Sequence, residues 1–189
     1  MPVIDLKPVR ERILDAAVEH YYADGIRAVS ADKLIAAAHV SKVTFYRHFP
    51  SKSDLVAAYL QIRSDEERSA VLAAREEHAA DPRAVLRWYA EVVGQLSCAA
   101  GFRGCPFINA AAELPDGDHP GRQVIDAHRV WLTGQIAEIL TEIGADDAGV
   151  KAEQLMMLRD GAMVSGYLGR APEDVTSALI GAGRSIIAG

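Results

Sequence analysis

Apolar residues recur at intervals of three and four positions along almost the whole chain. No alternation of apolar and polar residues persists beyond a few positions, so the pattern predicts helices and no strand. The first helix is expected over residues 8–23, with Ile13, Ala17 and Tyr21 on one face and Gly25 as its stop signal. The pattern therefore predicts an all-α protein.

Two short helices are expected next, each opened by a serine. Ser30 is a suitable N-cap for a helix that carries Leu34, and Ser41 is a suitable N-cap for a second helix. This second helix carries Phe45 and Phe49, whose spacing of four places both on one face, where they would pack inward. Two short helices joined by a tight turn form the outline of a helix-turn-helix.

Longer helices are expected in the rest of the chain. Ser51 and Asp54 form a capping-box-like pair that would start a long helix ending near His78. The polar segment LPDGDHPG is expected to be a loop. The remaining helices are expected at residues 83–98, 106–113, 122–143, 148–168 and 172–187. The predicted architecture is about nine helices: a three-helix helix-turn-helix domain over residues 1–53 and a larger helical domain over residues 54–189.

Composition places the chain among globular proteins, because half of its 189 residues are hydrophobic. The opening residues MPVIDLKPVRERIL contain no apolar stretch of signal-peptide length, and no run of about 18 apolar residues occurs in the chain. We therefore expect a cytoplasmic protein with no membrane partner. Cys98 and Cys105 are spaced C-x6-C, which matches neither a zinc knuckle nor a C-x-x-C redox pair, so two thiols are expected.

The formal charge of -6 is unevenly distributed. The chain through Leu55 holds 8 basic and 7 acidic residues, whereas the remainder holds 12 basic and 19 acidic residues. Between Lys33 and Ser53 there is no Asp or Glu at all. This asymmetry predicts a polyanionic partner for the N-terminal part only.

The outward face of the third expected helix carries side chains that suit DNA better than a merely solvated surface. Lys42 or Arg47 could donate to guanine O6 and N7, and Val43 offers an apolar contact to a thymine methyl group. Neighbouring polar side chains carry donors for phosphate oxygens, which position the helix. The candidate DNA-binding residues are Ser30, Ser41, Lys42, Val43, Thr44, Tyr46, Arg47, His48 and Lys52.

The stretch SADKLIAAAHVSKVTFYRHFPSKSDL, from Ser30 to Leu55, resembles the TetR family of bacterial one-component transcriptional regulators. The resemblance implies that residues 41–49 form the recognition helix and that the later helices bind a ligand and form a homodimer. It also implies a palindromic double-stranded DNA operator and a repressor that a small apolar or amphipathic effector releases. A transcriptional activator and a ligand-blind DNA-binding protein are the alternatives.

Two positions depart from the family pattern. His39 stands in the turn where relatives often have Gly, and a positive φ there is tolerated by His better than by most residues. Val43 stands where Gly is also frequent in the family, and its side chain would point toward the bases. The operator sequence of a relative therefore cannot be assumed for this protein.

The segment GFRGCPFINAAAELPDGDHPGR, residues 101–122, resembles a part of some TetR-family regulators that includes the short sixth helix. In the family this helix adjoins the ligand pocket, and its shift can transmit ligand binding. Large side chains and polar anchors are the candidates for that pocket, although such residues at helical spacing also serve as core. The candidate ligand-binding residues are Trp88, Phe102, Cys105, Phe107, Asn109, His128, Trp131, Met157 and Met163.

Cys105 has two further interpretations. Its place before Pro106 is a possible helix N-cap, where a thiol can act as a redox sensor, although a buried structural cysteine is the commoner case. An enzyme would use Cys105 as nucleophile and His119 or His128 as base. No G-x-S-x-G, phosphate loop or H-E-x-x-H supports catalysis, so we expect no enzyme, no catalytic residue, no metal site and no cofactor.

The last two expected helices contain several glycines among apolar residues, which would let helices approach closely. The resemblance implies that these two helices pair with their mates across a two-fold axis. A symmetric dimer is also what two half-site readers require. Packing within one chain is the alternative.

Overall fold

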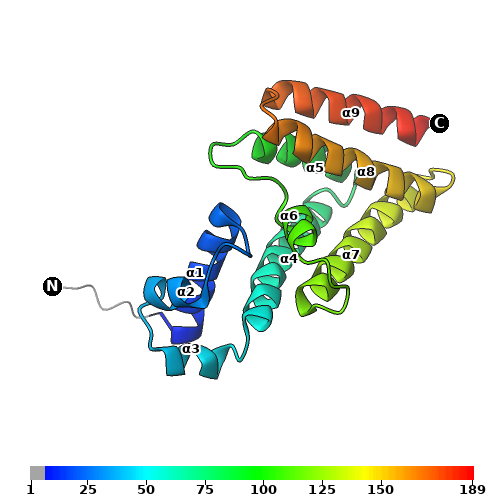
Figure 1. Cartoon of the computed structure of the whole chain (residues 1–189). Helices are drawn as coiled ribbons and strands as arrows, with labels where there is room; N and C mark the ends of the chain where they lie inside the picture. The colour runs from blue at the N-terminus through cyan, green and yellow to red at the C-terminus, as the bar shows by residue number, and fades with distance from the viewer. Residues whose placement is uncertain (1–6) are drawn as a thin grey trace. The chain divides into compact units, whose positions relative to one another are not determined.

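The computed structural model describes residues 7–189, and within this range it contains nine helices and no strand (Figure 1). The helices are α1 Val9–Asp24, α2 Ala31–Ala37, α3 Lys42–His48, α4 Lys52–Glu77, α5 Pro82–Ser97, α6 Pro106–Glu113, α7 Pro120–Glu142, α8 Ala148–Tyr167 and α9 Pro172–Ala188. The prediction of an all-α protein is confirmed, and the expected helix ends lie within two residues of those observed.

Side-chain caps explain where the short N-terminal helices begin. The Ser30 hydroxyl accepts a hydrogen bond from the backbone N–H of Lys33 at 3.2 Å, which opens α2. Ser41 caps α3 in the same way, because its hydroxyl accepts from the backbone N–H of Thr44 at 3.1 Å. At the start of α4, Asp54 N–H donates to Ser51 Oγ at 3.1 Å and Ser51 N–H donates to Asp54 Oδ2 at 2.9 Å. The predicted caps and the capping box are thus confirmed.

The chain divides into two compact units, which are described separately. Unit 1 contains residues 7–63 and 106–125, and unit 2 contains residues 64–105 and 126–189. Both α4 and α7 continue through a boundary between the units. The division into functional domains at residue 53 stays a prediction.

Unit 1 is organised around an aromatic and aliphatic core. Phe45 and Phe49 of α3 are 0% and 3% exposed, so the prediction that they pack inward is confirmed. The rings of Tyr21 and Tyr59 meet edge to face, with their centroids 5.6 Å apart. The turn before α3 contains His39, whose φ of 51° confirms the expected positive value.

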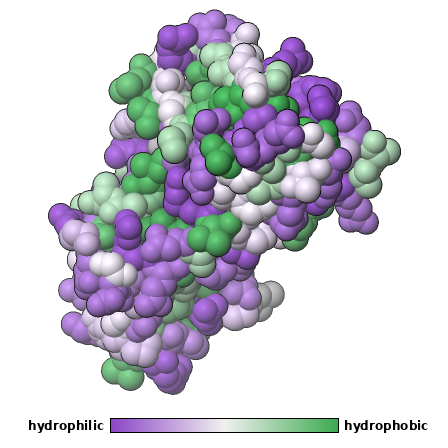
Figure 2. All heavy atoms as spheres, turned by 90° about the vertical axis from the view of Figure 1, so that its right-hand side faces the viewer, coloured by the Kyte–Doolittle hydropathy of each residue, from purple (hydrophilic) through white to green (hydrophobic). Residues whose placement is uncertain are grey.

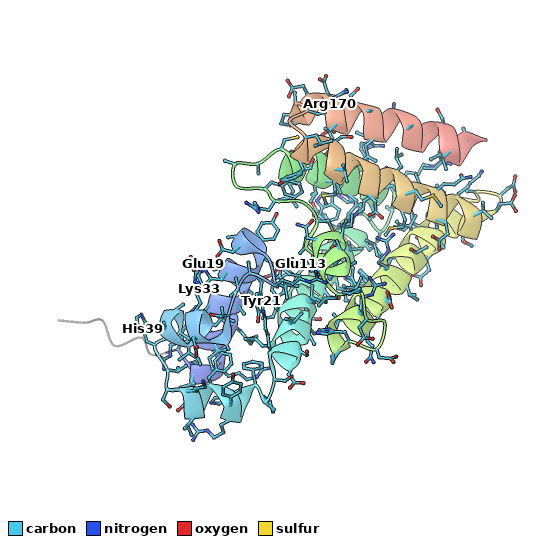
Figure 3. The ribbon with its side chains drawn as sticks, viewed as in Figure 1. Glu19, Tyr21, Lys33, His39, Glu113 and Arg170 are labelled. Carbon is cyan, nitrogen blue, oxygen red and sulfur yellow. The ribbon has the colours of Figure 1, made fainter. Side chains whose placement is uncertain are left out.

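Within unit 1, the end of α6 is bonded to the turn that follows α1 (Figure 3). The Glu113 carboxylate accepts from the backbone N–H of Ile26 at 3.0 Å and from that of Arg27 at 2.7 Å. In return, Arg27 Nε donates to the backbone carbonyl of Glu113 at 3.0 Å. Residues 86 and 87 positions apart in sequence therefore share a three-bond joint.

Unit 2 contains a layer of three helices, α5, α8 and α9, that pack against one another (Figure 1). Two glycines allow this close packing. A Cβ at Gly94 of α5 would lie 1.8 Å from Thr176 Oγ1 of α9, and a Cβ at Gly166 of α8 would lie 2.5 Å from Ser97 of α5. The hydrophobic core of this unit includes Leu132 of α7 and Met156 of α8, which are 2% and 1% exposed.

In residues 7–189, no helix is both long enough and apolar enough to cross a membrane. The opening residues 1–6, part of the stretch analysed for a targeting signal, lie outside the described residues.

Candidate functional site

The third helix presents the side chains that we predicted to read DNA bases. Lys42, Val43 and Arg47 are exposed, and Val43 is 79% exposed despite its apolar side chain. Lys42 Nζ lies 3.9 Å from Asp32 Oδ1, but both side chains are well solvated and such a pair contributes little. No described residue forms an ion pair with Arg47. These three side chains are free to reach a ligand outside the helix.

The residues predicted to bind phosphate lie around that face and differ in their exposure to solvent. Tyr46 is 39% exposed, and its ring meets that of Phe45 edge to face with centroids 5.3 Å apart. Thr44 and His48 are half-buried. Tyr46 is therefore held in place by the core while its outer edge stays accessible.

Lys52 is more engaged within unit 1 than the sequence suggested. Its ammonium nitrogen lies 6.0 Å from the centroid of the Tyr21 ring. Burial lowers the pKa of the Lys52 amine from its ordinary value, and the nearby Glu113 carboxylate opposes this effect. Lys52 would have to turn away from these partners to contact a phosphate.

Ser30 and Ser41 act as helix caps in this structure. Besides accepting from the Thr44 N–H, the Ser41 hydroxyl donates to Thr44 Oγ1 at 2.9 Å. A capping residue at the start of a recognition helix still lies next to the outward face, so its place in the DNA-binding set stays a prediction.

Unit 2 contains a partly buried polar cluster centred on Glu67 of α4. The Tyr89 hydroxyl donates to Glu67 Oε1, Arg159 Nη2 lies 3.4 Å from the same oxygen, and His128 Nε2 lies 3.2 Å from Glu67 Oε2. Ser64 Oγ lies 3.0 Å from His128 Nδ1, so the imidazole is held on both sides. Four helices, α4, α5, α7 and α8, contribute to this cluster.

The cluster keeps the Glu67 carboxyl ionised. Burial by itself raises the pKa of Glu67, but the hydrogen bond from His128 and the charge of Arg159 outweigh it and lower the pKa to about 2. Arg159 is 5% exposed and also donates to Cys105 Sγ at 3.3 Å and to Asp160 Oδ1 at 3.1 Å. Its charge is thus neutralised by groups of its own unit.

A cavity of about 420 Å³ lies in unit 2 and is lined by residues of α5, α7, α8 and α9. Its walls are largely aliphatic, and Tyr89 and Arg159 connect it to the polar cluster. This volume falls within the range of pockets that hold small molecules. Figure 2, which views the molecule from the side on which α9 ends, shows hydrophobic residues reaching the surface among hydrophilic ones in its upper part.

The nine residues predicted to contact a ligand are dispersed, and none of them lines this cavity. Phe107 and Asn109 belong to unit 1, and the other seven belong to unit 2. Cys105, Phe107, His128 and Met163 are buried, whereas Trp88, Phe102, Asn109 and Trp131 are half-buried. Met157 is 68% exposed. Ligand contact by these nine residues stays a prediction.

The sequence did not predict the cavity residues, because they come from four helices and no one helix carries a pattern that identifies them. The one local signal was the pair Arg83 and Arg87, two like charges at i and i+4 on α5. The position of Arg159 depends on partners from three other helices. Among residues 7–189, no three His, Cys, Asp or Glu side chains are grouped so that they could hold a metal ion.

A helix-turn-helix with an exposed basic face, in a chain with a larger helical unit, defines a DNA-binding transcriptional regulator. Comparisons with known proteins agree. The family model "Bacterial regulatory proteins, tetR family" matches residues 13–59. The structure of SCO4454, a TetR-family transcriptional regulator from Streptomyces coelicolor, is similar with a TM-score of 0.87 and 37% identity, covering 95% of this chain and 94% of that one.

Two curated relatives are also transcriptional regulators. The regulator AcuR of Cereibacter sphaeroides is 26% identical over 183 residues, which cover 92% of this chain and 83% of that protein. The uncharacterized HTH-type regulator YvkB of Bacillus subtilis is 36% identical over 64 residues, which span only 34% of the length of each protein. The chain belongs to the TetR family of bacterial transcriptional regulators.

Proposed function

We propose that the protein is a homodimeric repressor that binds a palindromic operator and is released when a small apolar or amphipathic effector enters unit 2. The observation that carries the proposal is the outward face of α3, on which Lys42, Val43 and Arg47 are exposed and no acidic residue occurs. Operator DNA lies in the bacterial cytoplasm, so the protein would act there.

In this proposal the residues of α3 divide by task. Lys42 and Arg47 donate to base edges, and Val43 contacts a thymine methyl group. Thr44, Tyr46, His48 and Lys52 contact phosphates and set the register, and Ser30 and Ser41 hold the helices that carry them. Residues 1–53 then form the DNA-binding domain, and residues 54–189 bind the effector and form the dimer.

The test is operator binding by the full-length protein, with Arg47→Ala as the decisive variant. Loss of a bidentate base contact lowers affinity by about 10- to 100-fold in fluorescence anisotropy with DNA from the protein's own promoter region. Arg170→Ala is the matched control, because Arg170 is an exposed arginine of unit 2 with the same charge (Figure 3). It should leave affinity nearly unchanged.

The salt dependence of binding completes the test. The logarithm of wild-type affinity should fall linearly with the logarithm of salt concentration, since phosphate contacts release counterions. Equal losses for the two arginine variants, or binding without preference for the promoter sequence, would contradict the assignment of α3 as the reading helix.

A further inference from the structure

The cavity of unit 2 combines apolar walls with an unusual set of charges. Its aliphatic wall includes Leu86 of α5, Ile136 of α7, Leu155 of α8, and Leu179 and Ile187 of α9. Such walls favour an apolar body over a polar one, because a polar group buried there would lose its hydrogen bonds to water.

All the charged residues that line the cavity are arginines. Unit 2 holds 16 acidic and 10 basic residues, yet four of the ten line the cavity and none of the sixteen does. A cavity with one sign of charge in a unit of the opposite net charge creates a local potential that attracts anions.

Three of these four arginines carry a charge that no described acidic residue neutralises. Arg159 is buried and already bonded to Glu67, Asp160 and Cys105. Arg83, Arg87 and Arg184 are exposed, and none of them forms an ion pair with a residue that the structure describes. Arg83 and Arg87 also repel each other as like charges at i and i+4 on α5, a cost that a bound anion would relieve.

We propose that this cavity binds an amphipathic molecule with an apolar body and one anionic head group. The apolar body lies against the aliphatic wall, and the head group lies among the guanidinium groups of Arg83, Arg87 and Arg184. Because the buried Arg159 is already neutralised, the positive charge available to a ligand is that of the three exposed arginines. Their guanidinium groups can donate to carboxylate or phosphate oxygens. The assignment rests on the proposed function, since it specifies the class of its effector.

The cavity lies on the opposite face of α8 from the exposed apolar residues of that helix. Leu155 and Arg159 line the cavity, whereas Met157, Val164 and Leu168 are 68%, 49% and 76% exposed. Positions separated by two or five residues on a helix lie on different sides. A partner that covers the exposed face of α8 would therefore leave the cavity side of this helix available.

The test measures binding of four ten-carbon probes to the full-length protein by isothermal titration calorimetry. The probes are decanoate, decyl phosphate, 1-decanol and decylamine, so the apolar body is constant while the head group changes. We expect the two anions to bind about 10-fold more tightly than the alcohol, and the amine to bind least. The tighter of the two anions identifies a carboxylate or a phosphate head group.

Paired substitutions distinguish the effect of the arginine charges on binding from an effect on folding. The double variant Arg87→Gln, Arg184→Gln should lose about 10-fold in affinity for decanoate and keep its affinity for 1-decanol. Arg87→Lys with Arg184→Lys should restore most of the loss, because it keeps both charges. Gly183→Leu should block every probe, because Gly183 lines the cavity and a leucine side chain there would occupy part of its volume.

Equal binding of the alcohol and the anions, or decanoate binding that ignores the arginine substitutions, would overturn the proposal. Operator binding in the absence of probes is measured separately and reports on the proposed function. A protein that binds its operator but no anionic probe refutes only the effector class. A protein that binds decanoate without any change in operator affinity retains the anion site and refutes effector release.

Discussion

Glu67 is a half-buried carboxylate that depends on partners from other helices. Tyr89 of α5 donates to it, and His128 of α7 and Arg159 of α8 lie within 3.4 Å of its oxygens. A buried ion pair contributes little compared with an apolar core, but removal of one partner is costly because the other charge remains buried. The cluster therefore makes the stability of the protein depend on the ionisation of Glu67.

The pH dependence of stability follows from the lowered pKa of Glu67. Its pKa of about 2 in the folded protein is below the usual 4.5, so its contribution is complete above pH 4.5 and is lost as the pH falls toward 2. Glu67→Gln should therefore lower the free energy of unfolding by about 3 kcal/mol at pH 7 and by about 1 kcal/mol at pH 3. Urea titrations at the two pH values measure the difference.

Glu76→Gln is the control for this experiment, because Glu76 is an exposed carboxylate on the same helix. It should change the free energy of unfolding by less than about 0.5 kcal/mol at either pH. The same loss for Glu67→Gln at both pH values would show that the cluster does not titrate through Glu67.

Single residues were predictable where their role depends on neighbours in sequence. Phe45 and Phe49 are four positions apart on one helix, and the positive φ of His39 belongs to a local turn. The partners of Glu67 are 22 to 92 positions away, so no local pattern could reveal them. For this reason, the sequence around Arg159 did not indicate its role.

In unit 1, the last residue of α6 holds the turn that follows α1. Glu113, the last residue of α6, accepts the two N–H groups at the turn after α1, and these donors have no helical partner of their own. The bonds to Ile26 and Arg27 are charge-assisted, which makes them stronger than ordinary hydrogen bonds. Displacement of α6 would therefore disturb the turn that leads into the helix-turn-helix.

Glu113→Ala should destabilise this joint. Loss of two hydrogen bonds to a carboxylate lowers the free energy of unfolding by roughly 2 kcal/mol, and the amide hydrogens of Ile26 and Arg27 should exchange faster with solvent. Glu113→Gln keeps one acceptor oxygen and should retain part of the protection. Hydrogen exchange of the full-length protein resolves both effects, and unchanged exchange at these two amides would refute the joint.

The ends of the helices were well predicted because their signals are local. Ser30, Ser41 and the Ser51–Asp54 pair cap α2, α3 and α4 as the sequence indicated. No local sequence signal predicted the Glu113 joint, because an acidic residue at the end of a short helix is usually a solvent-exposed charge. Its partner is the backbone of a turn 86 positions away, which carries no side-chain signature.

Helix α8 and its C-cap Leu168 carry an apolar stripe that no described residue covers. Val150, Met157, Val164 and Leu168 are separated by seven, seven and four positions, so they share one face, and they are 49% to 76% exposed. An exposed apolar stripe of this kind marks an interaction surface. It supports the proposal of a homodimer.

Negative charges within this stripe should separate the subunits. The double variant Met157→Glu, Leu168→Glu places four like charges in a symmetric interface, and sedimentation velocity should then find a monomer. Operator affinity should fall by at least about 100-fold, because one reading head replaces two. Glu153→Gln on the same helix is the control, and a double variant that remains dimeric would exclude α8 from the interface.

The fold class was predictable because helical periodicity and the helix-turn-helix motif extend over long, continuous stretches. The cavity was not predictable, because its wall is assembled from four helices between positions 83 and 188. The candidates drawn from large side chains therefore missed it. Size and hydrophobicity identify residues that are buried, but only packing decides which of them border an empty space.

The exposure of Val43 has a consequence for how this regulator can change over generations. Its side chain is 79% exposed and supports no part of the core, whereas Phe45 and Phe49 hold α3 in place. Substitutions at Val43 and Arg47 therefore cost little stability, and under the proposed function they would alter the preferred base sequence. A duplicated copy of the gene could acquire a new target site through a few such changes, at little cost to the stability of the fold.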